Sequence, residues 1–206
     1  MTESIPLYKV IVLGDSGVGK TSLCHVCKFN VFPENVEVTI GFDVWEKSVQ
    51  LHDCPEGNIR LQLWDTAGQE RFRFSITGKY YRGTHGALFI YDITNADSFE
   101  SLINWERELD KQTLGTVKPM KFLVGTKTDL ELQRKVPRTR AEHFAKEHSM
   151  HFFELSAKKD VEEIDRAFAY SAQKLYNTFE HNMIETPDYN ISVEDTGNVR
   201  KRNCIC

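Results

Sequence analysis

Residues 14–21 read Gly-Asp-Ser-Gly-Val-Gly-Lys-Thr, and they follow a nearly continuous apolar run, Leu7–Leu13. An apolar run of this kind is typical of a strand that is covered on both faces of a sheet. The octapeptide matches G-x-x-x-x-G-K-[ST], in which glycines let backbone N–H groups curl around phosphate oxygens at the start of a helix. A strand, a glycine-rich loop and a helix in this order predict an α/β fold with a site for nucleotide phosphates.

Two side chains of this loop add chemistry to its backbone. Lys20 is predicted to reach the β- and γ-phosphates, and the Thr21 hydroxyl is predicted to hold Mg²⁺. The loop is not a serine-hydrolase nucleophile elbow, because Val18 stands where G-x-S-x-G requires its last glycine. The predicted phosphate-binding residues are Gly14, Asp15, Ser16, Gly17, Val18, Gly19, Lys20, Thr21 and Ser22.

Further strands are visible as apolar patterns. Residues 87–93 and 122–124 are again apolar runs, whereas residues 59–63 alternate apolar with polar side chains. Residues 42–51 read as the hairpin partner of this alternating strand.

Three later stretches have helical spacing. Asp97 and Thr139 each stand three residues before a glutamate, the pattern of a capping box, so both are predicted to be helix N-caps. In residues 161–179 apolar side chains repeat every three or four positions. Strands alternating with helices predict an α/β sheet with helices on both faces.

A second phosphate segment, Leu-Trp-Asp-Thr-Ala-Gly-Gln-Glu, occupies residues 63–70. Asp65 ends a strand there, and a carboxylate in that position beside a phosphate loop predicts a second Mg²⁺ ligand. Gly68 is predicted to bring its backbone N–H close to a γ-phosphate, and Gln69 to orient the attacking water.

These motifs, with Thr-Ile-Gly at 39–41, Tyr-Tyr-Arg-Gly at 80–83 and Tyr-Asp-Ile-Thr at 91–94, resemble the Rab family of small GTPases over roughly residues 8–179. The resemblance implies a P-loop GTPase fold, a six-stranded, mostly parallel sheet with one antiparallel edge strand and helices on both faces. It makes Thr39 a further Mg²⁺ ligand, which closes onto the γ-phosphate. Catalysis of GTP hydrolysis to GDP then falls to Gln69, Lys20 and Gly68.

The stretch Thr126-Lys127-Thr128-Asp129 is by resemblance the base-reading segment, which in the family is usually Asn-Lys-x-Asp. Guanine presents N1–H and N2–H₂ on one edge, and the Asp129 carboxylate can accept from both. Ala157 is predicted to offer its N–H to the guanine O6. Because Thr126 has one hydroxyl where the family has an amide, we predict faster nucleotide release. The predicted base-side residues are Phe32, Thr126, Lys127, Asp129, Ser156, Ala157 and Lys158.

The resemblance also implies partners: an exchange factor, a GTPase-activating protein, a prenyl-escort protein or GDP-dissociation inhibitor, and effectors. Effectors would bind an aromatic triad that falls here at Val44, Trp64 and Tyr80, although Val44 departs from the family's phenylalanine and Phe42 lies nearby. The protein is expected to be a monomer. Its sequence at residues 8–21 and 148–150 resembles that of the Golgi and autophagy subgroup of Rab proteins.

Residues 180–206 read as a flexible tail behind a GTPase domain of residues 1–179. The chain ends Cys204-Ile205-Cys206, and Asn203 excludes a C-a-a-X box. This ending resembles the Rab Cys-x-Cys signal, in which Cys204 and Cys206 both receive geranylgeranyl chains. Two lipids give stable anchoring, so we expect the cytosolic face of an endomembrane, Golgi or vesicle, and cycling with the cytosol.

Composition narrows the function classes. The 206 residues carry 26 basic and 30 acidic side chains, a net charge of −4, which argues against a nucleic-acid binder. Five cysteines and a polar start predict a reducing, cytosolic compartment, and no apolar run approaches the roughly 20 residues of a transmembrane helix. Cys24 and Cys27 flank a histidine, but they are interpreted as buried helical thiols, not as metal ligands.

Three functions fit these residues. The favoured hypothesis is a GTP-hydrolysing membrane switch that regulates vesicle traffic. A scaffold that binds GTP constitutively is the alternative, which Gln69 opposes and Thr126 favours. A P-loop nucleotide kinase is the third, although it explains neither residues 65–70 nor the Cys-x-Cys end.

Overall fold

The computed structural model describes residues 5–34, 42–51, 57–66 and 78–180 of the chain. Within these residues six strands form one sheet in the order β2-β3-β1-β4-β5-β6. Strand β2 pairs antiparallel with β3 at one edge, and the other neighbouring strands pair in parallel. The predicted fold class, a mostly parallel six-stranded sheet with one antiparallel edge strand, is confirmed.

The elements alternate along the chain as the sequence predicts. The strands are β1 (Leu7–Leu13), β2 (Phe42–Gln50), β3 (Asn58–Thr66), β4 (Gly86–Asp92), β5 (Met120–Thr126) and β6 (His151–Glu154). The helices are α1 (Lys20–Phe29), α2 (Gly78–Tyr81), α3 (Ala96–Glu100), α4 (Leu102–Gln112), α5 (Arg138–Glu147) and α6 (Val161–Glu180), with a 3₁₀ helix, η2, at Thr128–Gln133.

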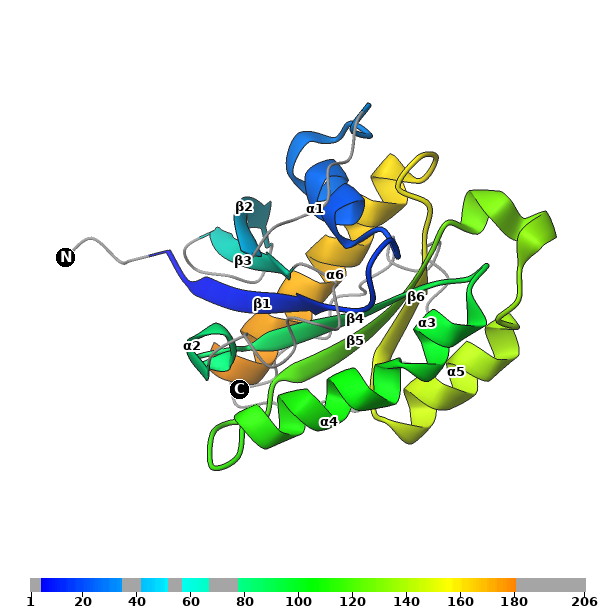
Figure 1. Ribbon diagram of the computed structural model, residues 1–206. Helices are drawn as coiled ribbons and strands as arrows, with labels where there is room; N and C mark the ends of the chain where they lie inside the picture. The colour runs from blue at the N-terminus through cyan, green and yellow to red at the C-terminus, as the bar shows by residue number, and fades with distance from the viewer. Residues whose placement is uncertain (1–4, 35–41, 52–56, 67–77, 181–206) are drawn as a thin grey trace, which may run out of the picture.

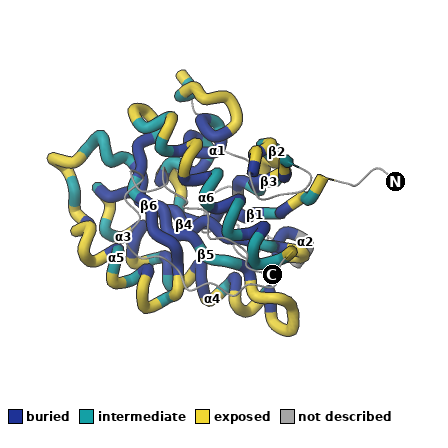
Figure 2. The backbone as a smooth tube through the Cα atoms, turned by 180° about the vertical axis from the view of Figure 1, so that it is seen from behind, coloured by how far each residue is buried: buried dark blue, intermediate teal, exposed yellow. Residues whose placement is uncertain are grey.

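Two apolar clusters hold the sheet between its helices. Figure 1 shows α1 and α6 on one face of the sheet and α3, α4 and α5 on the other. Every residue of β4 is buried, and the central strands are dark along most of their length in Figure 2. Because both faces are covered, the central strands need continuous apolar runs, and this explains their lack of alternation.

Two helix caps differ from the prediction. Asn95, not Asp97, caps the first of these helices, because its side-chain oxygen accepts from the N–H groups of Asp97 and Ser98. The predicted single helix after Asp97 is also broken at Ser101 into α3 and α4. Thr139 lies inside the first turn of α5, which follows Pro137 and has no side-chain cap.

The parallel register brings the carboxyl ends of the strands to one edge. Val12 of β1 lies opposite Asp65 of β3, and Asp92 of β4 lies opposite Thr126 of β5. Ligands of open α/β sheets bind at this edge. Among the described residues, no helix has the length and apolarity needed to span a bilayer.

Candidate nucleotide site

The loop between β1 and α1 has the backbone that its glycines predict. Gly14, Gly17 and Gly19 have φ angles of 148°, 76° and 98°, and a Cβ on Gly14 would lie 2.3 Å from the carbonyl oxygen of Ile90. Gly19 is the N-cap residue of α1 and has no side chain with which to cap it. The first N–H groups of α1 therefore receive no side-chain cap from Gly19, and a helix start of this kind is suited to an anion.

Lys20 lies inside this loop. Its side chain is only 5% exposed, and Nζ donates to the carbonyl oxygens of Gly14 at 3.0 Å and Asp15 at 2.8 Å. Burial lowers the pKa of Lys20 to about 8, against the opposing attraction of Asp65 and Asp15. Within the described residues, the loop thus places two neutral carbonyl oxygens against the Lys20 ammonium.

Thr21 and Asp65 meet beside Lys20. The Thr21 hydroxyl donates to Asp65 Oδ2 at 2.6 Å, and Asp65 is fully buried. Its other oxygen, Oδ1, has no hydrogen-bond partner in the described part of the chain. Burial raises the pKa of Asp65 to about 6, although the bond from Thr21 and the charge of Lys20 oppose the shift. A hydroxyl and an unpartnered carboxylate oxygen are the donor set that Mg²⁺ prefers.

The two base-reading segments follow β5 and β6, which lie two and three strands from β1 in the sheet. Ser156 donates its hydroxyl to Asp129 Oδ1 at 2.6 Å, which joins the two predicted base-reading segments directly. Asp160 braces them further, because its Oδ2 accepts from the Ser156 N–H at 2.7 Å and the Thr128 hydroxyl at 3.2 Å. The family resemblance implied both segments, and the structure brings them together.

Thr126 joins the base segment to the phosphate loop. Its hydroxyl oxygen lies 2.5 Å from the carbonyl oxygen of Val18 and 2.9 Å from that of Tyr91, and the residue is 4% exposed. A hydroxyl carries one proton, so it can donate fully to only one of these two carbonyls at a time. An asparagine amide would offer two N–H donors at this junction.

Two further base-side residues face each other across the site. The ammonium of Lys158 lies 5.6 Å from the centroid of the Phe32 ring. Lys127 has a left-handed backbone, with φ 62°, and its Nζ lies 2.6 Å from Asp92 Oδ2. Asp92 was not predicted; burial raises its pKa, but bonds from Lys127 and Thr94 outweigh this effect and lower it overall.

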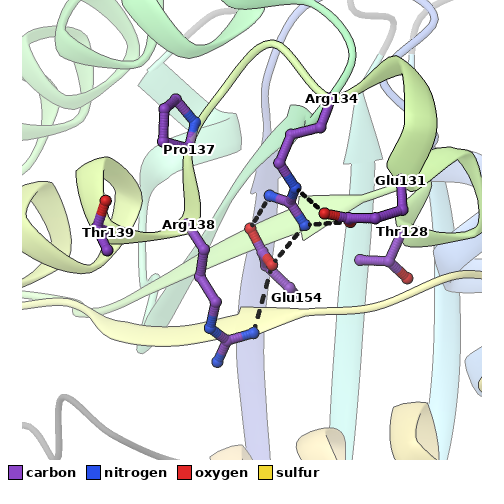
Figure 3. Close-up of a pocket in the computed structure, with 7 residues that line it drawn as sticks. All are labelled: Thr128, Glu131, Arg134, Pro137, Arg138, Thr139 and Glu154. Carbon is purple, nitrogen blue, oxygen red and sulfur yellow. Dashed lines mark hydrogen bonds and ion pairs between the residues drawn. The ribbon is translucent and has the colours of Figure 1, made fainter.

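A polar network behind the base segments was also not predicted. Arg134 donates to both oxygens of Glu154, at 2.8 and 3.0 Å, and to Glu131, and Arg138 donates to Glu154 as well (Figure 3). These side chains line a pocket of about 560 Å³. Two arginines and two glutamates neutralise one another there, so the pocket supports the loops on either side and presents no net charge to a ligand.

The predicted effector residues gather on one face of the β2–β3 edge. Val44 is 42% exposed and lies opposite Trp64 in the register, and Trp64 packs edge-on against Tyr80. Phe42, which the sequence analysis noted as lying near Val44, is 54% exposed and stacks on Trp64 with ring centroids 5.2 Å apart. An aromatic ring is thus present in this cluster, two residues before Val44.

Several predicted site residues lie outside the described residues: Thr39, Gly68, Gln69, Cys204 and Cys206. Cys24 and Cys27, which the sequence analysis interpreted as buried helical thiols, lie within the described residues. Both are buried as predicted. Burial raises the pKa of Cys27 to about 12. In the described ranges no three His, Cys, Asp or Glu side chains are grouped as a metal site.

The phosphate loop, its neighbouring carboxylate and the paired base segments define a P-loop nucleotide-binding protein with a base site suited to guanine.

Comparison with known proteins agrees. The model of the Ras family matches residues 9–177. Rab-10 of Diplobatis ommata is 41% identical over 192 residues, which cover 93% of this chain and 91% of that protein. Rab-33A of Mus musculus is 41% identical over 212 residues, which cover 98% and 86%. Rab-1 of Theileria parva is 42% identical over 176 residues, which cover 85% and 77%.

The chain therefore belongs to the Ras family and, within it, to the Rab small GTPases. It is a GTP-binding and GTP-hydrolysing switch of the Rab type, which acts in membrane traffic. The nucleotide-kinase alternative has no support. Because these three relatives are almost equally similar, at 41% to 42% identity, they do not separate one Rab subgroup from another.

Proposed function

We propose that this switch works through the residues that meet at the carboxyl edge of the sheet. Lys20 and the N–H groups at the start of α1 would hold the β- and γ-phosphates. Thr21 and Asp65 would hold Mg²⁺, whose charge helps neutralise those phosphates. The observation that carries this assignment is the Thr21–Asp65 bond of 2.6 Å, beside a buried carboxylate oxygen without a described partner.

In the GTP state, Thr39 would close onto Mg²⁺ and the γ-phosphate, and the Gly68 N–H would contact that phosphate. Gln69 would orient the water that attacks phosphorus, while Lys20 stabilises the charge that develops on the phosphate oxygens. Loss of the γ-phosphate would release both segments, and this release is the switch. Intrinsic hydrolysis should be slow, because an arginine supplied by a partner typically adds about 10³–10⁵ in rate.

Base selection would rest on Asp129. Its carboxylate would accept from the guanine N1–H and N2–H₂, whereas adenine would leave it without those donors. The Ala157 N–H would meet O6, and Phe32 and the stem of Lys127 would contact the faces of the base. The bond that Ser156 donates to Asp129 supports this role, because it aims the carboxylate.

Effectors would recognise the GTP state at Val44, Trp64 and Tyr80, and the stacking on Trp64 adds Phe42 to that surface. An exchange factor, a GTPase-activating protein and a GDP-dissociation inhibitor or prenyl-escort protein complete the partners that we expect. The protein itself would act as a monomer.

Membrane attachment would use the tail, residues 180–206, behind the GTPase domain of residues 1–179. Geranylgeranyl chains on Cys204 and Cys206 would anchor the protein to the cytosolic face of an endomembrane, such as Golgi or vesicle, from which it would cycle with the cytosol. Intact-mass analysis of protein from eukaryotic cells tests this directly. Unmodified cysteines would remove the proposed anchor.

Single-turnover hydrolysis of Mg²⁺·GTP, measured beside GDP release, tests the cycle itself. We expect slow hydrolysis in the wild type and none in Gln69→Leu. The two proteins should bind GDP with the same affinity. A wild type that holds GTP firmly without hydrolysing it would instead establish the scaffold alternative, in which partners bind without a cycle.

A further inference from the structure

Asp15 places a carboxylate inside the loop that is proposed to hold phosphates, where a free negative charge would repel the ligand. Its carboxylate is held by two donors from a distant part of the chain. Trp105 of α4 donates its indole N–H to Oδ1 at 2.9 Å, and Ser101, just before α4, donates its hydroxyl to Oδ2 at 2.6 Å. Each carboxylate oxygen thus accepts a charge-assisted bond.

We propose that Trp105 is a positioning residue that acts through Asp15 to fix the phosphate loop, and thereby sets how fast bound nucleotide leaves. The proposal rests on the nucleotide site described above and adds a residue that no motif of the sequence marks. Trp105 does not touch the phosphates in this scheme. Trp105 instead determines the position of the phosphate loop when the phosphates bind.

The donor side of this contact is rigid. Trp105 is fully buried and packs in the apolar cluster of α4 and α5, with Ile11 and Leu13 of β1 in the same cluster. The indole nitrogen is only a donor, so its single N–H commits the ring to one acceptor direction. A buried, closely packed ring cannot follow a loop that moves, and the loop must stay where the indole holds it.

The second donor, the Ser101 hydroxyl, is also directed at the phosphate loop. Ser101 stands at the N-cap position of α4 but makes no capping bond to that helix. Its hydroxyl lies 2.6 Å from Asp15 Oδ2 and 3.1 Å from the Ser98 carbonyl oxygen, so the shorter contact is the one to the phosphate loop. The break between α3 and α4 therefore brings a polar donor to the loop instead of extending the helix.

Asp15 connects these anchors to the phosphate-binding lysine. The side chain of Asp15 holds α4, while its backbone carbonyl accepts from Lys20 Nζ at 2.8 Å. A change in the backbone of Asp15 would move the anchored carboxylate and the acceptor of Lys20 together. The position of Trp105 is thereby transmitted to the Lys20 amine, which the motif assigns to the phosphates.

The test uses the full chain loaded with a fluorescent N-methylanthraniloyl derivative of GDP and Mg²⁺, chased with excess unlabelled GDP. Trp105→Phe keeps an aromatic ring and removes the N–H. We expect release about five- to tenfold faster, which is less than the full loss of one bond to a charged group because the indole acts on the phosphates only through Asp15. The matched control is Trp45→Phe, because the buried Trp45 indole N–H has no hydrogen-bond partner in the described part of the chain. Its release rate should match the wild type.

A purely structural tie would change stability without changing the loop. The ³¹P spectrum of bound GDP separates the two cases, since a displaced loop shifts the β-phosphate resonance. Asp15→Asn keeps an oxygen that accepts from the indole, and we expect it to release nucleotide more slowly than Asp15→Ala. Combining Asp15→Ala with Trp105→Phe should add nothing to Asp15→Ala alone, because the two residues act as one unit.

Trp105→Phe that melts at lower temperature, yet shows wild-type release and an unshifted resonance, overturns the proposal. If Trp105→Phe does not fold, Ser101→Ala removes the second donor, and wild-type release in that variant is equally decisive against it. A wild type that retains no labelled GDP would overturn the nucleotide site itself and this inference with it. That result is distinguishable, because it appears before any variant is measured.

Discussion

The two halves of the nucleotide site treat charge in opposite ways. In the phosphate half, residues 14–21 with Asp65, burial moves both ionisable partners toward their neutral forms, lowering the pKa of Lys20 and raising that of Asp65. In the base half, residues 126–129 with 156–158, charged groups already have partners. Lys127 pairs with Asp92, and Asp129 accepts from Ser156.

This difference indicates a division of labour. In the phosphate half, Asp65 Oδ1 has no hydrogen-bond partner among the described residues and burial disfavours the charges of Lys20 and Asp65, so phosphates and a cation would satisfy these groups and supply most of the affinity. The base half is already bonded, so a base gains less there and is instead selected by the directions of donors and acceptors. Variants in the phosphate half should therefore cost more than variants in the base half.

Lys20→Ala should have the largest effect. Removing one partner from a buried, charged contact typically costs about 2–5 kcal/mol, which is a loss of at least about thirtyfold in GDP affinity. Isothermal titration with Mg²⁺·GDP measures it, and Lys111→Ala, an exposed lysine of α4, is the control. A loss smaller than that of any base-half variant would reverse the division of labour.

Asp129→Asn should come next. Asparagine accepts one of the two guanine donors without charge, so GDP binding should weaken by about 1.5–3 kcal/mol. Xanthosine diphosphate has a carbonyl where guanine has N2–H₂, and the new amide N–H can donate to it. Competition against labelled GDP should show the preference moving toward xanthosine. If the affinities for GDP and for xanthosine diphosphate fall equally, the base half contributes affinity without selecting the base.

The sequence located the phosphate half almost completely, because its residues are contiguous. Gly14 to Thr21 form one motif, and Asp65 follows a recognisable strand. The base half could be predicted from the family resemblance, supported by the two segments of Asp129 and Ser156, each of which follows a strand. In both cases the chemistry lies next to a pattern that is visible along the chain.

What the sequence missed depends on contacts between distant residues. Trp105 is 90 positions from Asp15, and nothing in its local pattern distinguishes it from a core residue. Asp92 lies within the apolar run of residues 87–93 and ends β4, so the strand pattern accounts for the segment without pointing to a site residue. Asn95 and Asp97 are both good cap residues two positions apart, and only the backbone angles of the turn decide between them. Phe42 and Val44 share one face of β2, so the alternation cannot say which contacts Trp64.

Thr126→Val probes the junction between the two halves. The change removes the donor that links β5 to the Val18 carbonyl, and we expect a loss of about 1–2 kcal/mol in unfolding free energy together with faster GDP release. Thr113→Val is the matched control, because Thr113 is also buried and its hydroxyl donates to Leu109 within α4. It should lose similar stability and keep the wild-type release rate.

The reverse substitution asks whether one donor is too few at this junction. Thr126→Asn supplies two N–H groups for the carbonyls of Val18 and Tyr91, so GDP release should slow. Release unchanged in Thr126→Asn would show that the single hydroxyl limits nothing, even if Thr126→Val is fast.

The smallest effect should be the pH dependence that Asp92 gives the base half. Bonds from Lys127 and Thr94 lower the folded-state pKa of Asp92 below its unfolded value of 3.8. The stability it contributes is therefore present above about pH 4 and is lost as the pH falls through the folded pKa. Asp92→Asn keeps an acceptor for Thr94 but removes the charge facing Lys127, a partly exposed pair worth about 0.5–1 kcal/mol. Urea unfolding at pH 7 and at pH 3 should show the variant less stable than the wild type at pH 7 and a smaller difference between the two proteins at pH 3. A constant difference at both values would mean that the Asp92 carboxylate acts by its shape alone, and that the base half is not stabilised by charge.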